Sequence, residues 1–235
     1  FATEPVQGLN ARSLDYPRGR VLGGCSSING MIYMRGQAKD YDHWRQLGNL
    51  GWSWEDVVPC FLKSEDQAAI PVDDMHGEGG EWRVENQRLS WEILDAFRDA
   101  AEQAGIPKTD DFNRGDNEGC GYFQVNQRRG WRWSTSRGFL DPVKGRKNLC
   151  VFTRSQAQSL TIEEGRATGV VLQFKGEKAV IQVKTEVILA AGAIGSPQLL
   201  QLSGVGPGPL LREHGIDVKC DLPGVGENLQ DHLQI

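Results

Sequence analysis

The stretch GRVLGGCSSINGMIYMRG, from Gly19 to Gly36, is the most informative segment of this 235-residue chain. It carries five glycines, two serines and an asparagine, a composition too polar for a protein core. Glycines let a backbone approach a ligand closely, and hydroxyl and amide side chains can then hydrogen-bond to that ligand. Arg18 and Arg20 add positive charge suited to a phosphate or pyrophosphate. Composition alone is equally compatible with an ordinary glycine-rich connection.

A second distinctive segment, EVILAAGAIGSPQLLQLSGVG, runs from Glu186 to Gly206. Residues 187–190 have the apolar character of a buried strand, and the small residues that follow let a cofactor or a neighbouring strand come near. Ser196 and Pro197 are typical of a helix N-cap and first helical position. A tight strand-to-helix turn that needs small residues for packing explains the same pattern without any ligand.

These two segments resemble the two signatures of the glucose-methanol-choline (GMC) family of FAD-dependent oxidoreductases, in particular its choline dehydrogenase-like branch. Three further blocks are similar to the family: FATEP at the start, HGEGGEWRV from His76 to Val84, and LPGVGENLQDH from Leu222 to His232. They follow one another in family order from end to end of the chain. Two long signatures in the correct order are far more specific than a lone GxGxxG.

The resemblance implies a mixed α/β fold, namely part of a GMC-type FAD-binding domain with an antiparallel β-meander and flanking helices. Residues 1–37 would form the flavin-wrapping loop and residues 38–148 a helical and irregular region. Residues 149–235 would form the meander, a strand-turn-helix and the start of the crossover to the substrate domain. The chain lacks the family's N-terminal GxGxxG unit and its C-terminal catalytic region, so we expect a fragment of a longer protein.

The resemblance also implies which residues contact FAD. Those along the pyrophosphate and isoalloxazine would be Arg20, Gly23, Gly24, Ser27, Asn29 and Gly30, those beside the adenosine half would be Ala191, Gly192 and Ala193, and Ala157 would meet the adenine through its backbone. Some members carry a histidine, covalently linked to the flavin, where this chain has Ile28. Because isoleucine has no nucleophilic nitrogen, we predict non-covalent, dissociable FAD.

The whole enzyme implied by the resemblance transfers a hydride from a primary alcohol, choline-like or other, to flavin N5, while a base accepts the hydroxyl proton. In the family that base is a C-terminal histidine, and none of the four histidines here matches its motif. The catalytic residue is therefore unknown, and this fragment alone should be inactive. A hydroxynitrile lyase-type protein with non-redox FAD and an inactive truncated polypeptide are the alternatives. The substrate, the electron acceptor and the oligomeric state stay open.

Composition excludes several other classes of protein. The chain has 26 Lys plus Arg against 31 Asp plus Glu, a net charge of -5, and the basic residues are scattered, which argues against nucleic-acid binding. No apolar run reaches the roughly 18 residues of a membrane span. The five cysteines are widely separated and suggest reduced thiols, and no metal-ligand spacing is present. We expect a protein that is intracellular, either cytoplasmic or peripheral to a membrane, with any targeting segment upstream of Phe1.

Local patterns predict the individual elements. Helical spacing predicts helices over residues 40–47, after an N-cap at Ser53, from Ser90 to Gly105, after Ser134 and over residues 207–214. Period-two alternation predicts strands over residues 149–153, 157–162, 168–174, 179–183, 187–190 and 216–220. Turn signals at Glu164-Gly165 and Lys175-Gly176 make three of these strands a meander. We expect His76 to lie in a turn and the pair Asp231-His232 to be structural.

Overall fold

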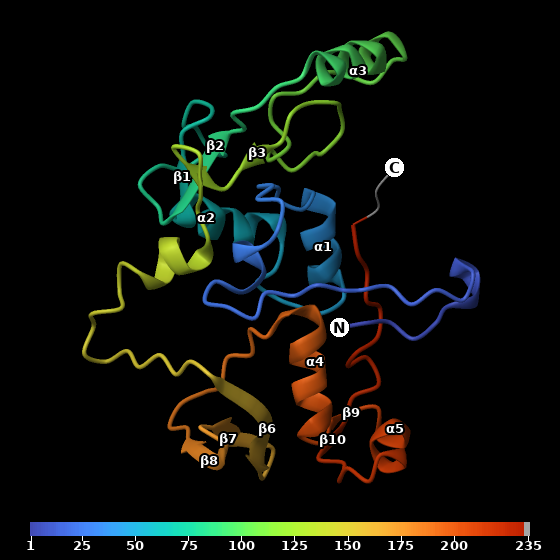
Figure 1. Ribbon diagram of the computed structural model, residues 1–235, viewed down its shortest axis with the longest axis vertical. Helices are drawn as coiled ribbons and strands as arrows, with labels where there is room; N and C mark the ends of the chain where they lie inside the picture. The colour runs from blue at the N-terminus through green and yellow to red at the C-terminus, as the bar shows by residue number, and fades with distance from the viewer. Residues whose placement is uncertain (233–235) are drawn as a thin grey trace. The chain divides into compact units, whose positions relative to one another are not determined.

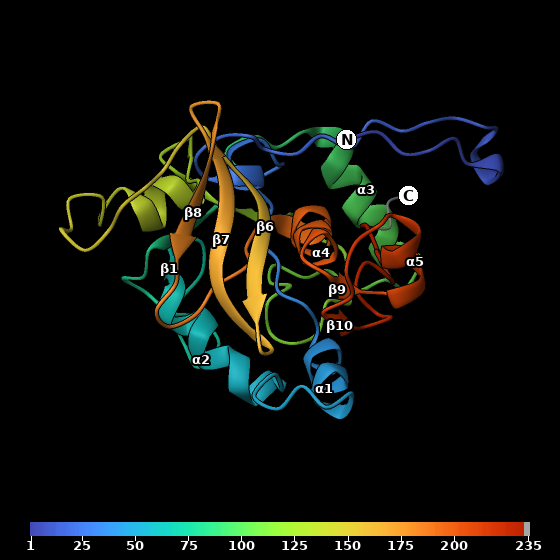
Figure 2. The same ribbon diagram turned by 90° about the horizontal axis from the view of Figure 1, so that it is seen from below.

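The computed structural model describes residues 1–232, and its contacts divide the chain into two compact units. The first unit is Phe1–Leu149 and the second begins at Cys150. The elements of both are labelled in Figure 1 and Figure 2. No helix among residues 1–232 has the length and apolar character that crossing a membrane requires.

The first unit opens with an irregular arm and the glycine-rich loop. The arm folds back on itself through isolated bridges, and short 3-10 turns occur at Gln7–Leu9 and Gly24–Ser27. Helices α1 (Ala38–Gln46) and α2 (Trp54–Ser64) follow, close to the predicted positions. Ser53 is the N-cap of α2 as predicted, since its Oγ accepts the Asp56 N–H while the Asp56 carboxylate accepts the Ser53 N–H. Aromatic rings of Tyr41, Trp54 and Phe61 pack between the two helices.

Short strands occupy part of the region predicted to be helical and irregular. They are β1 (Glu65–Gln67), β2 (Trp82–Asn86), β3 (Gln124–Val125), β4 (Gln127–Arg128) and β5 (Trp131–Arg132). β1 pairs in parallel with β2, β3 is antiparallel to β2, and β4 and β5 form a hairpin. The residues EDQ of β1 show no apolar alternation. They form a strand only because they pair with β2, which lies far away along the chain, so the local sequence does not predict it.

The rest of the first unit is helix α3 and a single π-helical turn. α3 spans Glu92–Gln103, with Trp91 rather than the predicted Ser90 at its N-cap position. The π-helical turn spans Ser136–Leu140, and the Ser134 hydroxyl accepts the Arg137 N–H.

The second unit contains the predicted antiparallel meander. Strands β6 (Ser155–Glu163), β7 (Arg166–Phe174) and β8 (Glu177–Gln182) pair in the order β6-β7-β8. Both connecting pairs, Glu164-Gly165 and Lys175-Gly176, have positive φ at each residue, which matches the right-handed twist of a tight hairpin. β8 is the outer strand and is exposed along its whole length.

Helix α4 covers the opposite edge of this sheet. It spans Gly192–Leu202 and lies beside β6, as Figure 2 shows. The Ser203 Oγ accepts the Leu160 N–H at 2.7 Å and donates to the Leu199 carbonyl, which fastens the end of the helix to the strand. Helix α5 (Gly208–Glu213) agrees with the predicted helix, and β9 (Val205–Gly206) pairs with β10 (Cys220–Asp221) in place of the longer strand predicted over residues 216–220.

Two predictions for the segment before α4 are wrong. Residues 187–190 form no strand, and Ile188 is 80% exposed. A buried strand needs neighbours for its N–H and C=O groups, and no strand among residues 1–232 pairs with this run. The helix also starts at Gly192 rather than after Ser196. The Ser196 hydroxyl instead accepts the Ala191 N–H at 3.0 Å and caps the helix from within its second turn.

Candidate functional site

The glycine-rich loop of the first unit turns sharply at Gly23 and Gly24. Their φ values are +91° and +54°, in the left-handed region that glycine tolerates. A Cβ on Gly19 would overlap the carbonyl oxygen of Gly24, so the backbone of the loop is closed on itself there. These glycines are therefore required by the loop's own geometry, independently of any ligand.

A segment more than 100 residues further along the chain holds this turn in place. Thr135 donates its backbone N–H to Ser26 Oγ at 2.9 Å, and its hydroxyl lies 3.2 Å from the Gly23 carbonyl oxygen. Ser26 Oγ itself donates to that carbonyl at 2.6 Å. The predicted residue Ser27 uses its hydroxyl proton on the Leu22 carbonyl at 2.9 Å. These bonds fix the loop from one side.

Asn29 is oriented by two donors. Its Oδ1 accepts the Met31 N–H at 3.0 Å and the Arg132 Nη1 at 2.9 Å, and Arg132 also bonds to the Ser26 carbonyl. Its Nδ2 has no hydrogen-bond partner among residues 1–232, and the side chain is exposed. Arg132 therefore turns the two amide hydrogens of Asn29 outward. Sequence reasoning missed this arginine, since its partner is 103 residues away.

The remaining loop residues leave room and charge for a ligand. Apart from the neighbouring residues in the chain, no heavy atom of residues 1–232 lies within 4 Å of the position that a Cβ would take on Gly24 or on Gly30. Arg20 is exposed, and its guanidinium forms no hydrogen bond or ion pair within the described part of the chain. An unpartnered cation, open glycine backbone and two outward amide hydrogens suit a molecule that carries phosphate and a ring with hydrogen-bond acceptors. The donor set thus fits FAD.

The other predicted contacts lie in the second unit. Ala157 is exposed on β6, opposite Leu172 and just before a bulge in the strand. Ala191 is the N-cap of α4, and Gly192 and Ala193 are its first two residues, all three exposed. Gly192 has a φ of +85°, and, neighbouring residues aside, the described part of the chain places no heavy atom within 4 Å of a Cβ built on it. That these residues and the glycine-rich loop bind one FAD stays a prediction.

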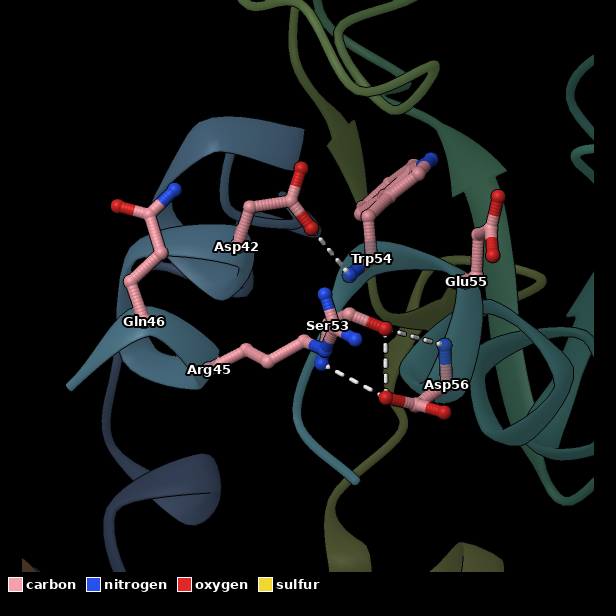
Figure 3. Close-up of a pocket in the computed structure, with 7 residues that line it drawn as sticks. All are labelled: Asp42, Arg45, Gln46, Ser53, Trp54, Glu55 and Asp56. Atoms are coloured by element: carbon pink, nitrogen blue, oxygen red, sulfur yellow. Dashed lines mark hydrogen bonds between the residues drawn. The ribbon is translucent and has the colours of Figure 1, made fainter. Parts of the chain in front are cut away.

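The pocket in Figure 3 is a different place. It has a volume of about 520 Å³ and is lined by Asp42, Arg45, Gln46, Ser53, Trp54, Glu55 and Asp56. Its hydrogen bonds serve the start of α2: Ser53 and Asp56 cap the helix, and Asp42 Oδ1 accepts the Trp54 N–H at 3.1 Å. None of the predicted FAD contacts lines it, and three carboxylates against one arginine give it an acidic lining.

His76 lies in the loop between β1 and β2, where its N–H donates to Asp73 Oδ1, and its side chain is part of a buried ionic cluster that we define as Arg35, Glu65, His76 and Asp111. The imidazole is fully buried, with Nδ1 at 3.2 Å from Glu65 Oε1 and Nε2 at 3.0 Å from Asp111 Oδ2. Burial by itself would lower the pKa of His76, but the hydrogen bonds to Asp111 and Glu65 outweigh it and raise the pKa to about 9. The histidine is therefore protonated at neutral pH.

Glu65 is the centre of the cluster. Burial by itself would raise the pKa of this carboxyl, yet hydrogen bonds from His76 and the Gly77 N–H and the charge of Arg35 hold it below its usual value. Arg35 Nη2 lies 3.0 Å from Glu65 Oε2, with both side chains buried. Among residues 1–232, no group of three or more His, Cys, Asp or Glu residues is placed to hold a metal ion.

The Asp231-His232 pair meets through a backbone group rather than through the imidazole. The His232 N–H donates to Asp231 Oδ1 at 2.9 Å, and the His232 side chain is exposed. No catalytic base is assigned within residues 1–232.

Comparisons with known proteins agree with the two signatures. The GMC oxidoreductase family profile matches residues 6–234. The oxygen-dependent choline dehydrogenase of Photobacterium profundum is 46% identical over 243 residues, and that of Sinorhizobium fredii is 43% identical over 234. Each match covers 100% of this chain and 42% of the relative, so the chain spans less than half of their length.

Solved structures agree in fold. Pyridoxine 4-oxidase from Mesorbium loti superposes with a TM-score of 0.88 at 31% identity, over 95% of this chain and 44% of that one. An FAD-dependent oxidoreductase from Chaetomium thermophilum also gives 0.88 at 31% identity, over 95% of this chain and 41% of its own. The predicted mixed α/β fold with an antiparallel meander is confirmed, and the chain belongs to the GMC oxidoreductase family, a family of FAD-binding flavoproteins.

Proposed function

We propose that the full-length protein is an FAD-dependent alcohol oxidoreductase and that this chain supplies part of its flavin-binding domain. FAD would accept a hydride, with its electron pair, from the carbinol carbon, and the hydroxyl proton would pass to a base outside this chain. The observation that carries the proposal is the outward amide of Asn29, held by Arg132 beside the open backbone at Gly30. Family membership supports it.

Each loop residue has a separate role in this proposal. The Arg20 guanidinium would neutralise pyrophosphate charge, because it has no competing partner within the described chain. Asn29 would donate to an acceptor on the flavin ring, and Gly24 and Gly30 would let the ligand come close to the backbone. Because the curated relatives are named as choline dehydrogenases, choline is the first substrate to test, followed by other primary alcohols.

Substrate-dependent flavin reduction is the direct test. Full-length protein mixed anaerobically with choline or another primary alcohol should lose its flavin absorbance near 450 nm, on the order of one flavin per active site. Omitting the alcohol is the control. Flavin that stays oxidised with every alcohol contradicts the redox proposal and favours the lyase-type alternative.

Replacing Arg20 with glutamine should weaken FAD binding by about tenfold or more, because hydrogen bonds to charged groups are worth about 1.5–3 kcal/mol. Titration of apoprotein with FAD, followed by flavin fluorescence, measures the dissociation constant. Arg18→Gln is the matched control, since the Arg18 guanidinium already donates to the Pro17 carbonyl and lies over the Tyr16 ring. If both substitutions change the dissociation constant equally, the proposal that Arg20 specifically binds the pyrophosphate is contradicted.

Non-covalent attachment is tested separately. Ile28 is 50% exposed on the loop and offers no nucleophile, so acid precipitation of the full-length protein should leave all of the flavin in the supernatant. Flavin that stays with the pellet would contradict this prediction without affecting the proposed reaction.

A further inference from the structure

The chain from Asn29 to Gly36, which we call the strap, leads directly from the flavin loop into the buried interior of the first unit. Its backbone is pinned along its length. The Met31 carbonyl accepts the Asn126 N–H at 2.7 Å, and Tyr33 donates its N–H to the Gln124 carbonyl at 2.8 Å. The strap is therefore held against β3 and the residue after it.

Arg35 holds the far end of the strap with both its backbone and its side chain. Its N–H donates to Asn113 Oδ1 at 2.7 Å, and its carbonyl accepts Asn117 Nδ2 at 3.1 Å. The guanidinium donates to the Met75 carbonyl at 2.7 Å and to Glu65 Oε2 at 3.0 Å. The guanidinium is buried, and its hydrogen bonds go to groups of the protein itself.

Gln67 connects the ionic cluster to the strap a second time. Its Nε2 donates to Glu65 Oε1 at 3.4 Å and to Gln124 Oε1 at 3.1 Å. The backbone of Gln124 is the partner of Tyr33. The cluster and the strap thus share one hydrogen-bonded network.

The strap carries a strained residue at the point where this network meets the flavin loop. Met31 has a φ of +64°, a left-handed conformation that is uncommon for a residue with a side chain. Such strain persists where the surroundings over-determine it, and it is frequently found at functional sites. The N–H of Met31 donates to Asn29 Oδ1, so the strained turn and the orientation of the Asn29 amide depend on each other.

A buried ionic cluster is a poor way to gain stability alone, because apolar residues of similar volume frequently serve as well. Its connection to the strap gives it another use. We propose that Arg35 is a positioning residue for the flavin: together with Glu65, His76 and Asp111 it fixes the strap and so the direction of the Asn29 amide. This inference rests on the proposed function, because it assumes that the loop binds FAD.

Protonated His76 is part of this support, so the support should depend on pH. Two carboxylates contact the imidazole directly: Glu65 from β1 and Asp111 on the loop after α3. The charge of Asp73, on the loop after β1, also interacts with it. Two arginines lie behind these carboxylates, since Arg35 pairs with Glu65 and Arg114 with Asp111. Loss of the imidazole proton removes one of the three cations, His76, Arg35 and Arg114, that neutralise these carboxylates. The strap should then loosen as the pH rises through about 9.

The experiment measures FAD binding by full-length protein with Arg35→Met, Arg35→Lys and His76→Gln substitutions. We expect Arg35→Met to raise the FAD dissociation constant by about 10–100-fold, the range seen when the groups behind a binding residue are removed. Arg35→Lys should recover part of this loss, since it keeps the charge but not the fork of donors. The matched control is Arg83→Met, which removes ion pairs with Asp66 and Glu85 that do not reach the strap.

The pH profile separates positioning from simple destabilisation. In the wild type the FAD dissociation constant should rise between pH 7 and about pH 10, whereas in His76→Gln it should be raised at pH 7 and change little with pH. The near-ultraviolet and visible flavin spectrum of the variants should also shift, since the ring's hydrogen-bonding changes. A folded Arg35→Met protein with the affinity and spectrum of the Arg83→Met control would overturn the proposal.

The outcomes remain distinguishable from failure of the proposed function. Wild-type protein that binds no FAD refutes the proposed function and this inference together, before any variant is made. Wild-type protein that binds FAD with unchanged variants refutes the inference alone. If Arg35→Met does not fold, the decision passes to Arg35→Lys and to the pH profile of His76→Gln, and flat, wild-type-like behaviour of both would overturn the proposal.

Discussion

Replacing Glu65 with glutamine is expected to destabilise the first unit by about 3–5 kcal/mol, the usual effect of removing one partner from a buried ion network. The carboxylate accepts hydrogen bonds from Arg35, His76 and the Gly77 N–H, and its side chain is fully buried. Glutamine has nearly the same volume, so no cavity forms. Its amide, however, leaves Arg35 without an anionic partner and His76 with Asp111 alone, and it turns donor hydrogens toward both cations.

Urea unfolding of this chain followed by tryptophan fluorescence measures the effect. All seven tryptophans lie in the first unit, so the signal reports on that unit alone. Glu81→Gln is the matched control, because the Glu81 side chain is exposed and has no ion pair within the described residues, and it should change the unfolding free energy by less than about 0.5 kcal/mol. An effect of Glu65→Gln as small as that of the control would contradict the prediction.

The stability of the first unit is also expected to fall by about 3 kcal/mol as the pH rises from 6.5 through about 9. The pKa of His76 is raised from 6.5 to about 9 in the folded protein, so the folded state holds the proton more tightly than the unfolded state. A raised pKa gives stability that is fully present below pH 6.5 and is lost as the pH passes the folded value. The pKa of Tyr33 is raised by burial to about 12, so this neighbour stays neutral over that range.

Unfolding free energies at several pH values, for the wild type and for His76→Gln, isolate the contribution of this histidine. The difference between the two proteins should shrink as the pH rises, because His76 loses its charge only in the wild type. His43→Gln is the control, since His43 is exposed on α1, and it should keep the wild-type pH dependence. A difference that stays constant from about pH 6 to about pH 10 would show that His76 is not charged in the folded state.

Elements with local signals could be predicted from the sequence, and elements with distant partners could not. The capping residues Ser53 and Asp56 lie three positions apart, and the meander turns carry their own glycines, so both were correct. β1 has no apolar alternation and is defined by its pairing with β2, 17 positions along the chain. The run over residues 187–190 shows the converse, because apolar residues form no strand when no neighbouring strand is present.

The same division holds for the candidate site. The six loop residues of the first unit could be singled out because one short signature contains them all. The groups that orient them, Thr135 and Arg132, are more than 100 residues away along the chain. His76 was placed in a turn, and its burial depends on carboxylates 11 positions before it and 35 positions after it. No spacing rule connects such partners.

The exposed outer strand of the meander has a consequence for solubility. Within residues 1–232, one edge of β8 has no strand paired to its N–H and C=O groups, and its residues Ala179, Val180 and Ile181 are apolar. An exposed apolar edge strand can pair with strands of other molecules and so lead to β-aggregation, and charged residues close to it oppose this pairing. Glu177 and Lys178 stand directly before these apolar residues and are exposed, which is the position at which charged gatekeeper residues oppose aggregation.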